Sequence, residues 1–196
     1  MARPSKKQTR LSNPAEQAEA LAAAVDQLAH ERVAHLVKDA ARAFIRSLQI
    51  RLVPHTVSYG HWTILRVLWD QDGLSQRALA ERAGVTEPTT FTAVKSLEGL
   101  GYVERTHLPG DNKKVHVFLT KQGRALKKKL VPLAEQVNSV SMAGITEAEI
   151  ETTRKVLIAM AYNLSRDEQA SGELGQRMPC LLYTSDADDD LLCVDL

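Results

Sequence analysis

Apolar residues recur at helical spacing along most of the chain, and strict alternation of apolar and polar residues is confined to one central stretch. The first helical pattern runs over residues 14–54, with Asn13 as a candidate N-cap, Pro14 at N1 and Glu16 at N3. Neither Gly nor Pro interrupts the pattern before Pro54, which predicts one long helix or two helices in tandem. A single helix of that length would span ~60 Å, more than a small domain covers. We therefore expect it to pack against a second subunit.

Capping and turn residues delimit the elements that follow. Helices are expected over residues 56–71, 76–83, 86–100, 120–141 and 146–166. Ser75 and Thr86 are suitable N-caps for the second and third of these helices, and Gly84 suits a tight turn between them. Strands are expected over residues 102–106 and 114–119, with a turn composition at 108–112. The predicted fold class is mostly α with a small β-hairpin wing (α+β), in the order of a winged helix-turn-helix.

The helix expected over residues 86–100 has two different faces. A helical wheel turns Thr90, Ala93, Val94 and Leu97 inward and Pro88, Thr92, Lys95, Ser96 and Gly99 outward, with Thr89 and Phe91 at the flanks. Small, hydroxyl-bearing and basic residues suit a helix that enters the DNA major groove. The candidate DNA-binding residues here are Ser75, Gln76, Pro88, Thr89, Thr92, Lys95 and Ser96. Phe91 either touches a thymine methyl group or packs within the protein.

The hairpin carries a second candidate contact with DNA. Basic side chains are expected around its turn, where they suit the negative potential of a narrow minor groove. The candidates are Arg105, Asp111, Lys113 and Lys114, with His107 beside them. A run of lysines at 127–129 is either a phosphate contact or a solvated helix face.

Charge is uneven along the chain, although the net charge is only +1. Residues 75–131 carry 11 basic and 5 acidic side chains, a net of +6, whereas residues 172–196 carry 1 basic and 6 acidic side chains, a net of −5. The basic segment indicates an anionic partner for the predicted winged unit. The acidic stretch is either a disordered tail or non-native sequence, because residues 181–187 resemble a translated adapter. We assign it no function.

The sequence lacks the motifs of several other classes of protein. No apolar run reaches the ~18 residues of a membrane span, and no signal peptide is evident, so a cytoplasmic protein is expected. Gly-rich phosphate loops, Gly-x-Ser-x-Gly and His-Glu-x-x-His are absent, and we expect no catalytic residues. The two cysteines, Cys180 and Cys193, lie near the C-terminus, and the histidine spacings suit no metal. We therefore expect neither a metal site nor a cofactor.

These segments together resemble the MarR (multiple antibiotic resistance regulator) family of bacterial transcription factors over about residues 15–166. The matching stretches are His61–Leu65, Leu79–Val85, Leu97–Val103 and Gly110–Gly123. The last stretch is similar to the family's wing signature, with Asp111 and Thr120 in place and Lys113 where the family has Arg. Lysine keeps the charge but not the planar hydrogen-bonding fork of arginine.

The resemblance implies a ligand-released repressor that binds a pseudo-palindromic operator in double-stranded DNA as a homodimer. Its implied parts are a flexible basic N-terminus (1–13), a dimerisation helix or helices (14–54), the winged helix-turn-helix (55–119), C-terminal dimerisation helices (120–166) and a disordered or non-native acidic tail (167–196). It also implies a cleft for a small-molecule effector. Aromatic residues beside cations suit an aromatic carboxylate or an anionic thioester there, and the candidates are Phe44, Arg46, His55, Tyr59, Trp62 and Arg66. The alternative function is a winged-helix module that binds protein rather than specific DNA.

Overall fold

The computed structural model describes residues 14–108 and 111–173. In chain order the elements are α1 (Pro14–Gln27), α2 (Val33–Leu52), the 3-10 turn η1 (Val53–His55), α3 (Tyr59–Asp70), β1 (Leu74–Ser75), α4 (Gln76–Ala83), α5 (Glu87–Gly99), β2 (Val103–Leu108), β3 (Asp111–Leu119), α6 (Lys121–Ser141) and α7 (Glu147–Glu173). The strands form one antiparallel sheet in the order β1-β3-β2. The predicted fold class, a mostly helical chain with a small β wing, is confirmed.

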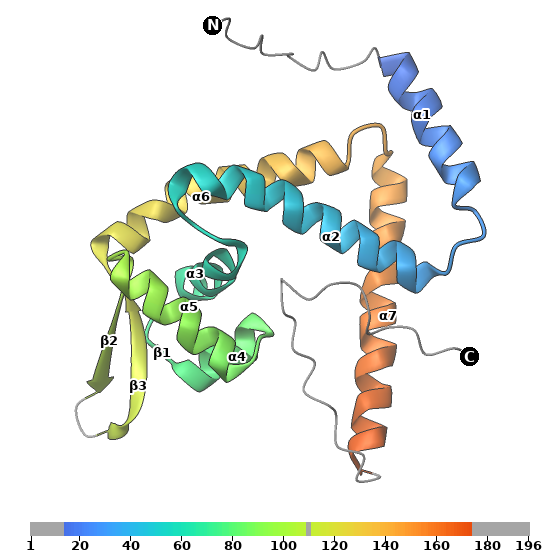
Figure 1. Cartoon of the computed structure of the whole chain (residues 1–196). Coiled ribbons are helices and arrows are strands. Elements are labelled where there is room, and N and C mark those ends of the chain that lie inside the picture. The colour runs from blue at the N-terminus through green and yellow to red at the C-terminus, as the bar shows by residue number, and fades with distance from the viewer. Residues whose placement is uncertain (1–13, 109–110, 174–196) are drawn as a thin grey trace, which may run out of the picture.

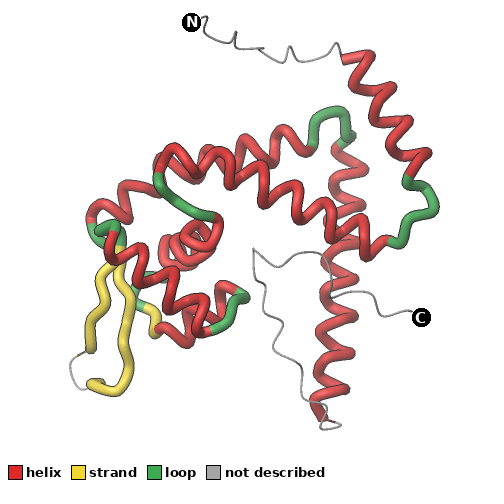
Figure 2. The backbone as a smooth tube through the Cα atoms, viewed as in Figure 1, coloured by secondary structure: helices red, strands yellow, loops and turns green. Residues whose placement is uncertain are grey.

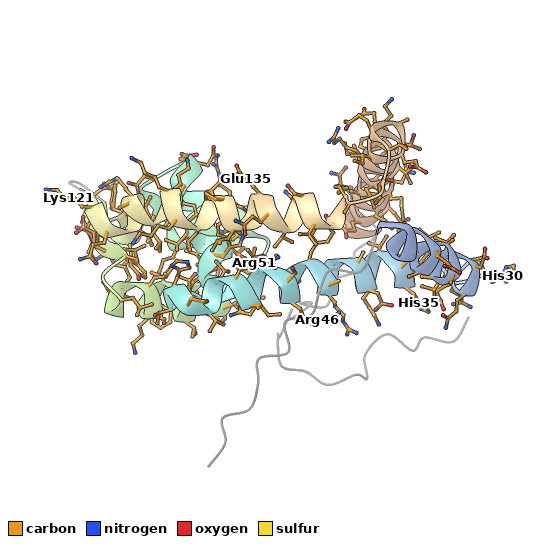
Figure 3. All side chains as sticks on the ribbon, turned by 90° about the horizontal axis from the view of Figure 1, so that it is seen from above. His30, His35, Arg46, Arg51, Lys121 and Glu135 are labelled. Carbon is orange, nitrogen blue, oxygen red and sulfur yellow. The ribbon has the colours of Figure 1, made fainter. Side chains whose placement is uncertain are left out.

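The helices are arranged around a compact winged unit. In Figure 1, α2 and α6 lie along one side of α3, α4, α5 and the sheet, and the β2–β3 hairpin projects away from them. Figure 3 shows α2 and α6 side by side when the molecule is turned by 90°. Helices α1 and α7 extend beyond the unit on the side opposite the hairpin, as the backbone tube in Figure 2 also shows.

The core lies between the pair of helices α2 and α6 and the winged unit of α3, α4, α5 and the sheet. Leu52, Leu65, Leu97 and Leu130 are each completely buried, and they come from α2, α3, α5 and α6 in turn. Val117 of β3 is buried among the same residues. Burying one such leucine contributes ~1.5–3 kcal/mol relative to leaving it in water. This shared core holds the winged unit firmly against α2 and α6.

The structure decides between the two alternatives for the first helical pattern and moves two helix boundaries. The pattern forms two helices in tandem, separated by a turn over residues 28–32 in which Glu31 accepts a hydrogen bond from the Arg32 N–H at 2.9 Å and contacts His35 at 2.6 Å. Helix α3 begins at Tyr59, since Thr56 adopts a left-handed conformation (φ 60°) and Ser58 caps the helix. Helix α7 continues to Glu173, past the expected boundary at 166.

The sheet is also larger than predicted. Strand pairing extends to Leu108 and Asp111, so most of the segment expected as a turn belongs to the strands. Residues 109–110 lie outside the described part of the chain. The two-residue strand β1 was not predicted, and it pairs Leu74 with Val117 and Ser75 with His116. The basic N-terminus at 1–13 and the acidic stretch beyond Glu173 also lie outside the described residues.

Candidate nucleic-acid interface

The turn between α4 and α5 is built by the residues expected to build it. The Ser75 hydroxyl accepts a hydrogen bond from the Ala78 N–H at 3.3 Å and so caps α4. Gly84 takes the left-handed conformation (φ 67°) that a glycine adopts without steric cost. The Thr86 hydroxyl accepts from the Thr89 N–H at 3.3 Å and caps α5. These local interactions fix where α5 begins.

The two faces of α5 are as predicted. Thr90, Val94 and Leu97 are completely buried, and Ala93 is half-buried beside them. The exposed residues are Glu87, Pro88, Thr89, Phe91, Thr92, Lys95, Ser96 and Gly99. The helix therefore presents a small-residue, hydroxyl-bearing face with one cation to solvent, and its opposite face anchors it in the core.

The two candidates that precede α5 are less accessible. Ser75 and Gln76 are half-buried, and the Ser75 hydroxyl is already engaged in capping α4. The side-chain nitrogen of Gln76 is buried and has no hydrogen-bond partner among the described residues. The structure therefore does not place these two side chains on the same exposed surface as Thr92, Lys95 and Ser96.

The sequence suggested that Arg105 lies around the hairpin turn, but the structure places it further back along β2. It pairs with Val117 inside the hairpin, well before the end where Leu108 faces Asp111. Its guanidinium forms an ion pair with Glu98 of α5, with Nη2 2.6 Å from Oε2, and lies over the ring of Phe91, with Cζ 5.7 Å from the ring centroid. Placing Arg105 at the tip was wrong because strand pairing runs further than the turn composition indicated.

The end of the hairpin holds the remaining basic candidates. Lys114 is exposed, and its backbone carbonyl accepts a hydrogen bond from the His107 ring at 3.1 Å. Asp111 and Lys113 belong to β3, but their side chains lie outside the described part of the structure. Their contact with DNA stays a prediction.

Sequence reasoning missed the part that Glu98 plays. The hydrogen bonds that Arg105 donates to its carboxylate hold the pKa of Glu98 below its ordinary value. A signal for this contact is present in the sequence, because Phe91 and Glu98 are seven residues apart and so share one helix face. Which strand residue would meet that face is not visible from spacing alone.

The effector candidates are divided between the core and the surface. Trp62 is buried in the core and makes an edge-to-face contact with Trp69, with ring centroids 5.6 Å apart. Phe44, His55 and Tyr59 are half-buried, whereas Arg46 and Arg66 are exposed. Figure 3 labels Arg46 and Arg51 on α2, and Arg51 donates to the hydroxyl of Ser47 at 2.7 Å. Trp62 packs in the core, and its contact with an effector stays a prediction.

Within 14–108 and 111–173, no group of three His, Cys, Asp or Glu side chains is placed to hold a metal ion. None of the helices in those ranges is long and apolar enough to cross a membrane.

Comparisons with known proteins agree on one family. The model of the MarR family matches residues 57–115. The chain is 33% identical over 129 residues to the HTH-type transcriptional regulator TtmR of Methylorubrum extorquens, a match that covers 66% of this chain and 63% of TtmR. It is 30% identical to the HTH-type transcriptional regulator YybA of Bacillus subtilis, covering 65% of this chain and 85% of YybA.

A solved structure shares the same architecture. The Bordetella bronchiseptica protein BpsR, whose DNA binding is regulated by 6-hydroxynicotinic acid, superposes with a TM-score of 0.62 at 27% identity, covering 67% of this chain and 99% of BpsR. The fold and the matches define a winged helix-turn-helix transcriptional regulator. The chain belongs to the MarR family.

Proposed function

We propose that this chain is a ligand-released repressor that binds a pseudo-palindromic operator in double-stranded DNA as a homodimer. The outer face of α5 carries the DNA-binding part of the proposal, because Thr92, Lys95 and Ser96 are exposed while the opposite face is buried. Hydroxyl groups and an ammonium on a helix of small residues suit the base edges and phosphates of the major groove. The hairpin beside α5, with Lys114 exposed near its end, suits the neighbouring backbone or minor groove.

The homodimer is supported by apolar side chains outside the core. Large apolar residues are exposed on α1 and in the turn after it, on the first half of α2, around the α6–α7 turn and along α7. They include Leu21, Val25, Leu28, Val33, Val140, Ile145, Leu157, Ile158, Tyr162 and Leu164. An apolar surface of this extent is typical of a protein interface. Two copies that bury it would hold two α5 helices for half-sites about one DNA turn apart.

The effector is proposed from the surroundings of α2 and α3. Half-buried Phe44 and Tyr59 lie on helices that also carry the exposed cations Arg46 and Arg66. Aromatic rings beside cations favour an aromatic carboxylate or an anionic thioester, and BpsR responds to an aromatic carboxylate. No catalytic step is part of the proposal, and a repressor of this kind would act in the cytoplasm, where bacterial DNA lies.

Selection from a random-sequence duplex library tests the proposal. We expect the full-length protein to enrich a pseudo-palindrome and to bind it at least ~10³-fold more tightly than a scrambled duplex of the same length, the lower end of the range for specific regulators. The same anisotropy titration with 6-hydroxynicotinic acid and with aromatic acyl thioesters then tests release. Equal affinity for the selected and scrambled duplexes would refute specific DNA binding.

A further inference from the structure

Three side chains from two elements meet at the boundary between α5 and the wing. Phe91 and Glu98 belong to α5, and Arg105 belongs to β2. Arg105 donates from Nε to Glu98 Oε2 at 2.9 Å, and its Nη2 lies 2.6 Å from the same oxygen. The Arg105 Cζ lies 5.7 Å from the centroid of the Phe91 ring. One strand residue therefore contacts two side chains of the same helix.

The two contacts lie on one face of α5, two turns apart. Phe91 and Glu98 are seven residues apart in the helix, which places their Cα atoms ~10 Å apart along its axis. The buried face of α5 anchors the helix in the core, and at its edge two separated contacts oppose rolling and tilting against the strand better than one contact would. The orientation of α5 decides where Thr92, Lys95 and Ser96 point, because all three belong to this helix and lie on its exposed side.

We propose that Arg105 is a positioning residue that fixes the angle between α5 and the wing, and that operator specificity depends on this three-residue clamp of Phe91, Glu98 and Arg105. The proposal rests on the proposed DNA-binding function and assigns Arg105 a role different from a phosphate contact. The Arg105 and Glu98 side chains keep only 27% and 35% of their exposure. The positive charge of Arg105 is offset by a carboxylate in contact with it, so the pair offers a phosphate little net charge.

The clamp has chemical requirements that a simple cation would not meet. A guanidinium is planar, so its edge can donate to Glu98 while its face lies over the Phe91 ring. A lysine ammonium keeps the charge but has no fork and no flat face. Arg105→Lys therefore distinguishes a phosphate-binding role of Arg105 from a positioning role. A phosphate contact would tolerate lysine, whereas the clamp would not.

Glu98→Gln also distinguishes the phosphate-binding role from the positioning role, because the two roles predict opposite changes in operator affinity. If Arg105 contacted a phosphate, removing the neighbouring carboxylate would free the guanidinium and strengthen binding. If the clamp positions α5, the same change releases one of the two contacts and weakens operator binding. Glu81→Gln is the matched control, since Glu81 also pairs with an arginine, Arg77 at 3.1 Å, but within the single helix α4 and fully at the surface.

The experiment uses the full-length wild type and the three variants, titrated with the selected operator duplex and with the scrambled duplex at several salt concentrations. The clamp predicts that Glu98→Gln and Arg105→Lys each bind the operator about tenfold more weakly. For the scrambled duplex, the affinity of Glu98→Gln should stay within about twofold of that of Glu81→Gln. The affinity of Arg105→Lys for the scrambled duplex should stay within about twofold of the wild-type value. The loss should appear as a lower specificity ratio with an unchanged salt slope, because no phosphate contact is removed. Scrambled-duplex binding also reports the folded fraction, so a variant that misfolds loses both affinities and is distinguished from one that has lost positioning.

Two results would overturn the clamp. Glu98→Gln binding the operator as tightly as Glu81→Gln does would exclude it, as would Arg105→Lys keeping wild-type affinity. If one variant misfolds and loses affinity for both the operator and the scrambled duplex, the other variant decides alone. Phe91→Leu, which removes the ring face and keeps an apolar side chain, must then also lower the specificity ratio. A wild type that fails to distinguish the operator from the scrambled duplex would instead refute the proposed function.

Discussion

Replacing glycine by alanine inside a helix usually stabilises it. At Gly123, in the first turn of α6, the surrounding atoms leave no room for the added methyl group. A Cβ at Gly123 would lie 2.0 Å from the carbonyl oxygen of Tyr102 and 3.2 Å from a methyl group of Leu119. Ordinary van der Waals contact begins near 3.4 Å, so α6 or the start of β2 must move by about 1 Å or more to admit alanine. We therefore predict that Gly123→Ala destabilises the protein.

The magnitude follows from what that movement disturbs. Thr120 donates from its N–H to Tyr102 O at 3.1 Å and from its hydroxyl to Gly101 O at 2.7 Å, and Trp69 donates from Nε1 to Gly123 O at 2.9 Å. Overpacking costs ~1–3 kcal/mol, each lost hydrogen bond costs ~1 kcal/mol, and the better helix propensity of alanine offsets ~1 kcal/mol. The expected net destabilisation is ~2–3 kcal/mol, or roughly 4–12 °C in Tm for a chain of this size.

Thermal unfolding followed by far-UV circular dichroism, at one fixed protein concentration, measures this effect. Gly99→Ala is the matched control, because Gly99 is also helical and a Cβ there meets nothing within 4 Å. Its Tm should stay level or rise by the equivalent of up to ~1 kcal/mol. A Gly123→Ala protein as stable as the wild type would show that the junction between α6 and β2 is not packed as described.

Three other outcomes are expected. Lys113→Ala should weaken operator binding and lower the slope of log K against log salt by about one, and an unchanged slope would mean that the end of the hairpin stays off the DNA. Ile158→Glu, on the exposed apolar face of α7, should shift the dimer towards monomer in analytical ultracentrifugation, while Lys155→Gln on the same helix should not. Nuclear magnetic resonance titration should place the pKa of Glu98 below its ordinary value of 4.5, and Arg105→Met should return it. Because this pKa is lowered, the ion pair contributes fully above 4.5 and is lost as the pH falls through the lower folded value; an unshifted pKa would contradict the contact.

The sequence by itself determined the features that depend on neighbours a few residues away. Ser75 and Thr86 were recognisable as caps, and each accepts the expected backbone hydrogen bond. The two faces of α5 followed from helical period, since burial on one side of a helix repeats every three or four residues. These signals depend only on residues close together in the sequence, so they can be recognised without knowing how the elements pack.

Some local features were nevertheless left open or missed. The turn between α1 and α2 contains no Gly or Pro, so the sequence did not decide between one long helix and two helices in tandem. The hairpin pairs further than its turn composition indicated, because pairing along two strands can continue into residues that also favour turns. The error at the hairpin comes from a weak local preference for turns that strand pairing overruled.

Only the tertiary structure decided which side chains meet between elements. The sequence did not show which residues Arg105 contacts, and the packing of β2 against α5 brings it onto Glu98 and Phe91. Gly123 ends a stretch that resembles the family, but its packing role appears only where the start of α6 touches the backbone of Tyr102. The physical reason is the same in both cases: helix period and capping are set within a few residues, whereas a contact between a strand and a helix depends on their separation and crossing angle, which the whole core sets together.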